Sequence, residues 1–168
     1  MVIRPYAAAD RDAVCDLFVR VNRELAPADL RAAFEDYIAL SLRQEIGRIA
    51  DYYAERNGRF FVAEQDGRLA GMFGLEGIGM PEAELRRMYV DAAFRGTGLA
   101  QAMLDHAEQA CRAAGTPVLT LSTSELQRAA LAFYAKSGYA LVREETATAP
   151  SNKTVGGNIR RYHFEKTL

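Results

Sequence analysis

Residues 89–110, YVDAAFRGTGLAQAMLDHAEQA, combine an extended pattern, a loop and a helical pattern in immediate succession. An apolar run ends at Val90, a short linker contains Arg95-Gly96-Thr97-Gly98, and a helical pattern begins at Leu99. A helix N-terminus leaves about four backbone N–H groups without partners, and its dipole attracts anions. Because glycines let a ligand approach the backbone and Arg95 adds a positive charge, the loop favours binding of a phosphate or pyrophosphate.

This loop differs from two common phosphate-binding motifs. No Lys-Ser/Thr pair follows Gly98, as a Walker A loop requires, and the third glycine of the dinucleotide-binding fingerprint is replaced. From these residues alone, a tight turn between a strand and a helix that binds no ligand remains the alternative interpretation.

The rest of the sequence alternates extended and helical patterns. Strands are predicted at residues 2–6, within 59–77 around the Asp66-Gly67 turn, and at 83–90, 117–124, 139–145 and 159–168. Helices are predicted at residues 14–25 after an N-cap at Asp10, at 27–56 with a break near Ser41 or Gly47, and at 99–114 and 127–136. Because several strands follow one another directly, we predict an α/β fold of the α+β type, with helices flanking a central mixed, mostly antiparallel sheet.

The composition argues against several classes of protein. A chain of 168 residues with 49% hydrophobic residues is expected to form one globular domain. Its net charge of −1 gives no strong field for nucleic acid or an anionic membrane. Because no segment resembles a signal peptide or a membrane span, we expect a cytoplasmic protein. Cys15 and Cys111 are expected to be reduced core thiols, and no residues have the spacing of metal ligands.

Two blocks within residues 84–142 resemble the Gcn5-related N-acetyltransferase (GNAT) superfamily. Arg95-Gly96-Thr97-Gly98-Leu99-Ala100 is similar to its Arg/Gln-x-x-Gly-x-Gly/Ala loop, and LQRAALAFYAKSGYALV is similar to its later helix with an FYxKxGF ending. The resemblance implies a single acetyl-CoA-dependent N-acetyltransferase domain over residues 1–168, with acetyl-CoA as cosubstrate. We predict no metal, because no residues have the spacing of metal ligands.

The resemblance also assigns residues to the cosubstrate. The backbone of Met88 and Val90 would hold the pantetheine arm, and the Val90 amide would stabilise the oxyanion. Gln127 lies where the family often has an asparagine that hydrogen-bonds CoA. Glutamine at this position departs from the family pattern: it keeps the side-chain amide and adds one methylene. The pyrophosphate would be bound by the loop that comprises Arg95, Gly96, Thr97, Gly98, Leu99 and Ala100.

Tyr134 and Glu84 are the candidate catalytic residues that the resemblance implies. Tyr134 would protonate the leaving thiolate, since a phenol stays protonated at neutral pH; the alternative is a tyrosine that only packs in the core. Glu84 would accept the proton of the amine; the alternatives are an ordinary exposed glutamate, a bound water as base, or Glu76 or Glu82 in its place. Strand alternation predicts that Glu84 and Met88 share one face, unless a bulge intervenes.

Two histidines are less suited to catalysis. His106 is expected to face solvent from its helix, and His163 is expected to have a structural role, although a strand position could place it against a pocket.

The acceptor is expected to be a small polar molecule with a primary amine. Alternatives are a protein or peptide acceptor, a longer acyl chain admitted near Phe73, and a non-catalytic acyl-CoA-binding module; a homodimer is also left open. The residues expected on the acceptor side come from the early helices and the late polar loop, namely Tyr37, Arg43, Glu45, Tyr52, Tyr53, Asn152, Lys153, Thr154 and Tyr162.

Overall fold

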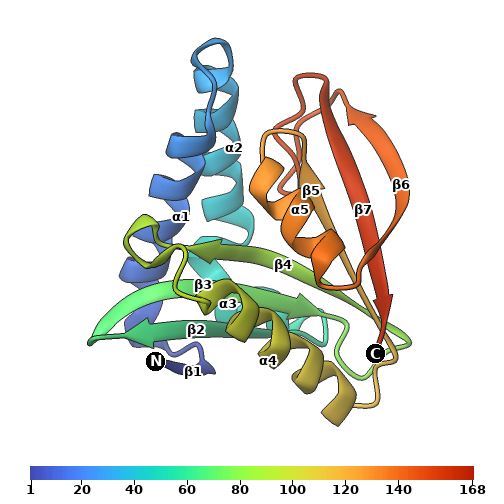
Figure 1. The fold of residues 1–168 in the computed structure, drawn as a ribbon. Helices are drawn as coiled ribbons and strands as arrows, with labels where there is room; N and C mark the ends of the chain where they lie inside the picture. Colours follow the sequence, from blue (N-terminus) through green and yellow to red (C-terminus); the bar gives the residue numbers. More distant parts are fainter.

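A seven-stranded sheet forms the centre of the computed structural model, which describes every residue from Met1 to Leu168 (Figure 1). Its strands are β1 (Val2–Pro5), β2 (Arg59–Gln65), β3 (Arg68–Glu76), β4 (Glu82–Val90), β5 (Val118–Ser124), β6 (Ala140–Ala147) and β7 (Ile159–Thr167). They lie in the order β1-β2-β3-β4-β5-β7-β6, and only β4 and β5 run parallel to each other. The predicted mixed, mostly antiparallel sheet is therefore confirmed.

Helices cover both faces of this sheet. They are α1 (Arg11–Leu25), α2 (Arg31–Gln44), α3 (Ile49–Ala54), α4 (Leu99–Ala113) and α5 (Arg128–Lys136). α1 and α2 stand on one side of β1 to β4, whereas α4 crosses the other side (Figure 1). The predicted break in residues 27–56 is confirmed, because α2 ends at Gln44 and a 3-10 turn precedes α3. No helix has the length and apolar composition that a membrane crossing requires.

Alternating side chains of the strands supply two separate hydrophobic cores. In β2, Phe61 and Ala63 belong to a cluster of 18 buried residues that includes α4 and α5. Phe60 and Val62 belong to a second cluster, of 13 buried residues, that includes α1, α2 and α3. The sheet thus has an α4–α5 face and an α1–α2 face, and an opening through the sheet would connect these two environments.

The sheet opens between β4 and β5, and β4 contains an extra residue at this point. β4 pairs with β5 only as far as Leu85, and the rest of β4 has no partner on that side. Towards β3, Met72 lies opposite Tyr89 while Gly74 lies opposite Arg86, so β4 contains one more residue than β3 in this interval. This arrangement is a β-bulge, which bends the strand that carries the extra residue.

The bulge lies at Arg87, which has a left-handed φ of +55°. As a result, Arg86 and Arg87 both reach Glu45 on the α1–α2 face. Met88 instead packs with the hydrophobic cluster on the α4–α5 face. The prediction that Glu84 and Met88 share one face is therefore wrong, because the bulge reverses the alternation of the strand between these two residues.

Glu45, which directly follows α2, is a fully buried carboxylate that joins this helix to the bulge. Its oxygens accept hydrogen bonds from Arg86 at 2.6 Å, from Arg87 at 2.7 Å and from the Tyr53 hydroxyl at 2.7 Å. Burial opposes the charge, but the positive charges and hydrogen bonds of Arg87 and Arg86 outweigh it and lower the pKa of Glu45 to about 2. The bulged segment is therefore tied to the end of α2 by charge-assisted hydrogen bonds.

We expect Glu45→Gln to lower the free energy of unfolding by about 3–5 kcal/mol, because Arg87 remains buried without a countercharge and Arg86 loses one of its carboxylate partners. The pKa of Glu45 in the folded protein lies below its ordinary value of 4.5, so its stabilising effect is complete above about pH 4.5 and is lost as the pH falls towards about 2. Denaturant unfolding at a series of pH values should show the difference between wild type and variant shrinking over this interval.

Glu55→Gln is the matched control for this measurement. Glu55 forms an exposed ion pair with Arg48 at 2.6 Å, and such pairs contribute little to stability. Equal effects of the two substitutions, or a difference that does not change with pH, would contradict the role that we assign to Glu45.

Candidate active site

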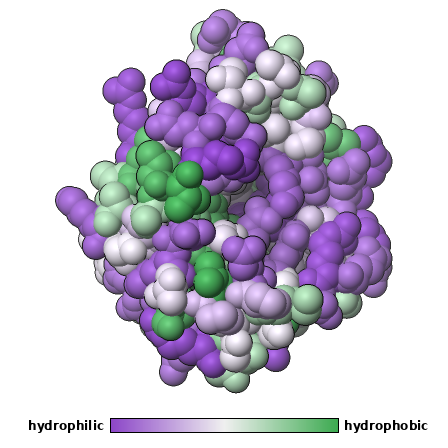
Figure 2. Space-filling model, turned by 90° about the vertical axis from the view of Figure 1, so that its right-hand side faces the viewer, coloured by the Kyte–Doolittle hydropathy of each residue, from purple (hydrophilic) through white to green (hydrophobic).

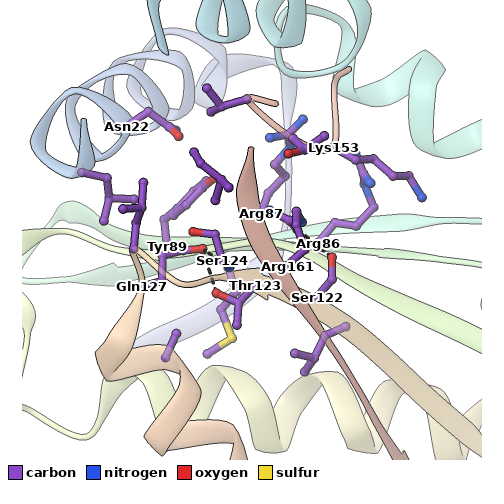
Figure 3. Close-up of a pocket in the computed structure, with 18 of the residues that line it drawn as sticks. Asn22, Arg86, Arg87, Tyr89, Ser122, Thr123, Ser124, Gln127, Lys153 and Arg161 are labelled. Carbon is purple, nitrogen blue, oxygen red and sulfur yellow. Dashed lines mark hydrogen bonds between the residues drawn. The ribbon is translucent and has the colours of Figure 1, made fainter. Parts of the chain in front are cut away.

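A cavity of about 120 Å³ lies where β4 and β5 part. It is lined on one side by α5 and on the other by α1, α2 and the loop that contains Asn152 and Lys153. Figure 3 shows Asn22 and Lys153 above the central strands, and Thr123 of β5 and Arg161 of β7 near the centre of the view. The cavity therefore has one wall on each face of the sheet.

Tyr134 dominates the wall on the α4–α5 face. Its side chain is 8% exposed, and its hydroxyl donates to the Met88 sulfur at 3.7 Å. Burial, assisted by the neighbouring Tyr89, raises the pKa of Tyr134 well above the ordinary value for a phenol. The hydroxyl therefore keeps its proton at neutral pH. Gln127 and Ala130 line the same wall, and Gln127 Oε1 accepts a hydrogen bond from Thr123 Oγ1 at 2.8 Å.

The backbone of β4 presents polar groups to the gap. The Asp91 amide donates to the Ala70 carbonyl of β3 at 2.9 Å. By strand alternation, the polar backbone groups of Val90 and Met88 point the opposite way, towards the edge that β5 has left unpaired. This edge can accept an extended ligand in place of a strand, by the same hydrogen bonds that join strands in a sheet.

The glycine loop precedes α4 and is exposed. Gly96 and Gly98 have φ values of +75° and +86°, and a Cβ atom on either would meet nothing within 4 Å. Among the hydrogen bonds outside the regular helices and strands, none is donated by the backbone amides of Gly96, Thr97, Gly98, Leu99 or Ala100. These free amides, at the N-terminus of a 15-residue helix, suit an anionic ligand such as a phosphate.

Two side chains of this loop have internal partners. Arg95 forms an exposed ion pair with Glu24 of α1 at 2.9 Å, and the Thr97 hydroxyl donates to the Phe94 carbonyl at 2.7 Å. An exposed ion pair is weak, so Arg95 can exchange Glu24 for a ligand at little cost.

Several residues expected on the acceptor side line the wall on the α1–α2 face. Tyr37, Asn152, Lys153 and Thr154 do so. Three others do not: Glu45, Tyr52 and Tyr53 are buried in the protein. Arg43 borders a separate outer hollow, and Tyr162 packs with the hydrophobic cluster of the opposite face.

Glu84 also lines the cavity, with a side chain that is 28% exposed. One of its oxygens accepts from Lys153 Nζ at 2.7 Å, and the other lies 3.6 Å from Arg86. Glu76 binds Arg86 at 3.0 Å and borders the outer hollow, whereas Glu82 is exposed at the start of β4 and lies outside the cavity. Among the three glutamates considered as bases, Glu84 alone therefore lies in the cavity.

The histidines and cysteines lie outside the cavity. The expectation that His106 faces solvent is wrong: its ring packs against Phe61 and Phe73 at centroid distances of 5.0 and 6.1 Å. His163 lies 2.9 Å from a Glu145 oxygen on the neighbouring strand. Phe73, beside which a longer acyl chain was considered, is fully buried. No cluster of three or more potential metal ligands is present.

Sequence reasoning missed several polar residues of the cavity wall, Asn22, Thr123 and Ser124 among them. Arg86, Arg87, Ser122 and Arg161 all line the cavity, and Arg161 is adjacent to Ser122 in Figure 3. For Arg161 the sequence gives part of the answer. Consecutive residues of a strand face opposite sides of the sheet, so Arg161 and Tyr162 must lie on different faces. The face on which each would lie depends on pairing with β5, which the sequence does not reveal.

The surface around the site is mainly hydrophilic. Figure 2 shows a face with small, separated hydrophobic patches and a hollow near its centre. An outer hollow of about 590 Å³ shares Asn152 and Lys153 with the cavity and is lined by three arginines, Arg43, Arg48 and Arg56.

A family model described as the Acetyltransferase (GNAT) family matches residues 18–139. The chain belongs to the GNAT family of acetyltransferases. It is similar to N-acetyltransferase 8F1 of Rattus norvegicus, with 29% identity over 63% of this chain and 50% of that protein. An IAA acetyltransferase of Azospirillum brasilense is 30% identical over 77% of this chain and 78% of its own length. The GNAT chain spans about half the length of the N-acetyltransferase 8 relatives that it matches.

Solved structures share the same GNAT fold. The PaiA N-acetyltransferase of Thermoplasma acidophilum in complex with coenzyme A has a TM-score of 0.77 and 18% identity, covering 99% of this chain and 98% of that one. A ribosomal-protein-alanine N-acetyltransferase of Brucella melitensis has a TM-score of 0.74 and 17% identity over the whole of both chains. At these identities the likeness concerns the fold alone.

Proposed function

We propose that this protein is an N-acetyltransferase that transfers the acetyl group of acetyl-CoA directly to the primary amine of a small polar molecule. The observation that carries this proposal is the gap between β4 and β5. It combines an unpaired strand edge at Met88 and Val90, a buried phenol at Tyr134 and, on the opposite wall, the carboxylate of Glu84.

The chain's free backbone groups fit the parts of the cosubstrate. The amides of the glycine loop suit the pyrophosphate, and the open edge of β4 suits the amide-containing pantetheine arm. When bound, acetyl-CoA supplies an acetyl thioester that an amine can attack. The Val90 N–H can then donate to the carbonyl oxygen as negative charge develops on it.

Proton transfer can be assigned to two residues on opposite walls. Tyr134, which keeps its proton, donates to the leaving sulfur as that atom gains charge. Glu84 accepts the amine proton directly or through water, and it must first leave its ion pair with Lys153. Neither cysteine lines the cavity, which favours direct transfer over an acyl-enzyme on cysteine.

The enclosure of the acceptor wall supports a small acceptor. Side chains of α1, α2 and the loop at residues 152–155 surround a cavity of about 120 Å³. A protein or peptide acceptor would need an open groove beside the sheet. The experiment that tests the function is thiol release from acetyl-CoA with a panel of amines, amino acids, polyamines and N-terminal peptides. A chain that binds CoA but releases no thiol with any of them would be a non-catalytic binding module.

We expect Gly98→Trp to abolish CoA binding in calorimetry, because the new side chain would fill the space open beside the free amides. The matched control is Gly115→Trp, at the other end of α4. Gly115 also has a left-handed φ, of +75°, and open space around it. Unchanged CoA affinity in a folded Gly98→Trp variant would contradict the proposed role of the loop.

We expect Tyr134→Phe to reduce the rate of thiol release by about 10–1000-fold, the usual contribution of proton transfer. CoA affinity should change little, because the phenol acts mainly in the transition state. A variant that loses stability but retains its turnover would show that Tyr134 serves only to pack the core.

We expect Glu84→Gln to lower turnover at neutral pH and to regain part of it as the pH rises. At higher pH more of the amine is already deprotonated, so a base is needed less. Glu82→Gln, on the same strand but outside the cavity, is the matched control. An unchanged pH–rate profile in Glu84→Gln would assign the base to a bound water.

A further inference from the structure

Arg161 lies on the acceptor wall without an ion-pair partner. It lies opposite Ser124 of β5, and its guanidinium donates to the Ser122 hydroxyl at 2.7 Å. Glu145 is its neighbour on β6, but the Glu145 oxygens bind His163 at 2.9 Å and Arg143 at 3.0 Å. The Arg161 charge is therefore held in a largely enclosed place with only a neutral hydroxyl as partner.

The other charges around this wall compensate one another. Three cations pair with three carboxylates, namely Arg86, Arg87 and Lys153 with Glu45, Glu76 and Glu84. Arg161 is the fourth cation, so the wall carries one positive charge in excess. Burying a charge without a partner is costly, which indicates that something else supplies the negative charge when the site is in use.

One hydrogen-bond donor of Arg87, on the same wall, lacks a partner. Nε of Arg87 is buried without a hydrogen-bond acceptor, and it is the chain's single buried side-chain nitrogen or oxygen in this condition. Arg87 lines the cavity together with Arg161. Unpaired buried donors are uncommon in folded proteins, so the unpaired Nε of Arg87 adds to the excess of positive charge and donors over acceptors at this cavity.

The approach to this wall is positively charged as well. The outer hollow that shares Asn152 and Lys153 with the cavity is lined by Arg43, Arg48 and Arg56 and by a single carboxylate, that of Glu76. Clefts lined mainly by one sign of charge raise the local concentration of ligands of the opposite sign. The whole chain has a net charge of −1, so this positive region is a local feature.

We propose that the acceptor amine carries a carboxylate, and that the guanidinium of Arg161 binds this carboxylate. This inference rests on the proposed function, because it names the class of acceptor for that reaction. A carboxylate matches the planar fork of an arginine and supplies the one negative charge that the wall lacks. Arg161 and Tyr134 line the same cavity, from β7 and α5, so a carboxylate held by Arg161 lies in the same cavity as the proposed proton donor.

The test compares α-amino acids with their carboxamides, which keep the amine but lose the negative charge. The value of kcat/KM is measured by thiol release at saturating acetyl-CoA for wild type, Arg161→Gln and Arg161→Lys. The matched control is Arg160→Gln, which removes an exposed arginine beside Arg161 that lies 3.8 Å from Glu144. Comparing the acid-to-amide ratio between variants cancels the different intrinsic reactivity of the two amines.

We expect Arg161→Gln to lower kcat/KM for the acids by about 10–100-fold, the effect of losing a hydrogen bond between charged groups. The carboxamides should react at nearly the wild-type rate, Arg160→Gln should change neither substrate, and Arg161→Lys should restore part of the loss. Calorimetry with an N-acetyl amino acid and its amide should give the same ranking in the absence of turnover.

Two outcomes would overturn these assignments, and they can be distinguished. If Arg161→Gln lowers the rates of acid and amide equally, or if wild type does not discriminate between the two N-acetyl compounds, the carboxylate inference is wrong and the acetyltransferase function stands. If wild type binds CoA but releases thiol with no amine of either kind, the proposed function itself is wrong.

Discussion

The site depends on one buried carboxylate that binds two consecutive arginines. Neighbouring residues of a regular strand point to opposite faces, so Arg86 and Arg87 can both reach Glu45 only if the strand bulges. The bulge bends β4, and β4 has no paired residues with β5 beyond Leu85. The cavity, the open strand edge and the position of Met88 on the α4–α5 face all lie at or beyond this bulge.

The gap joins two environments with different chemistry. On the α4–α5 face, apolar packing surrounds Tyr134 and keeps its hydroxyl protonated. On the α1–α2 face, ion pairs surround Glu84, and Arg161 remains without a countercharge. A sheet opened at its centre can therefore keep a proton donor apart from charged groups that would otherwise perturb it, while an extended ligand reaches both through one passage.

Local sequence patterns predicted the elements well and the side-chain directions less well. The glycine loop and the positions of the strands along the chain reflect short-range rules, and the structure confirms the predicted strands and the break before α3. The prediction that Glu84 and Met88 share one face was wrong because the strand bulges at Arg87, where the two arginines meet Glu45, about 40 residues away in the sequence. The prediction that His106 faces solvent was wrong because its neighbours Phe61 and Phe73 come from strands distant in the sequence.

The sequence by itself determined the mixed fold, the position of a glycine loop directly before a helix, and the family resemblance, because each follows from residues close together in the chain. Only the tertiary structure decided which charges meet. Strand pairing brought Arg161 beside Ser122. The packing of α2 on β4 placed Arg86 and Arg87 in ion pairs with Glu45. Whether a charge remains uncompensated depends on all its spatial neighbours, and a linear pattern does not contain that information.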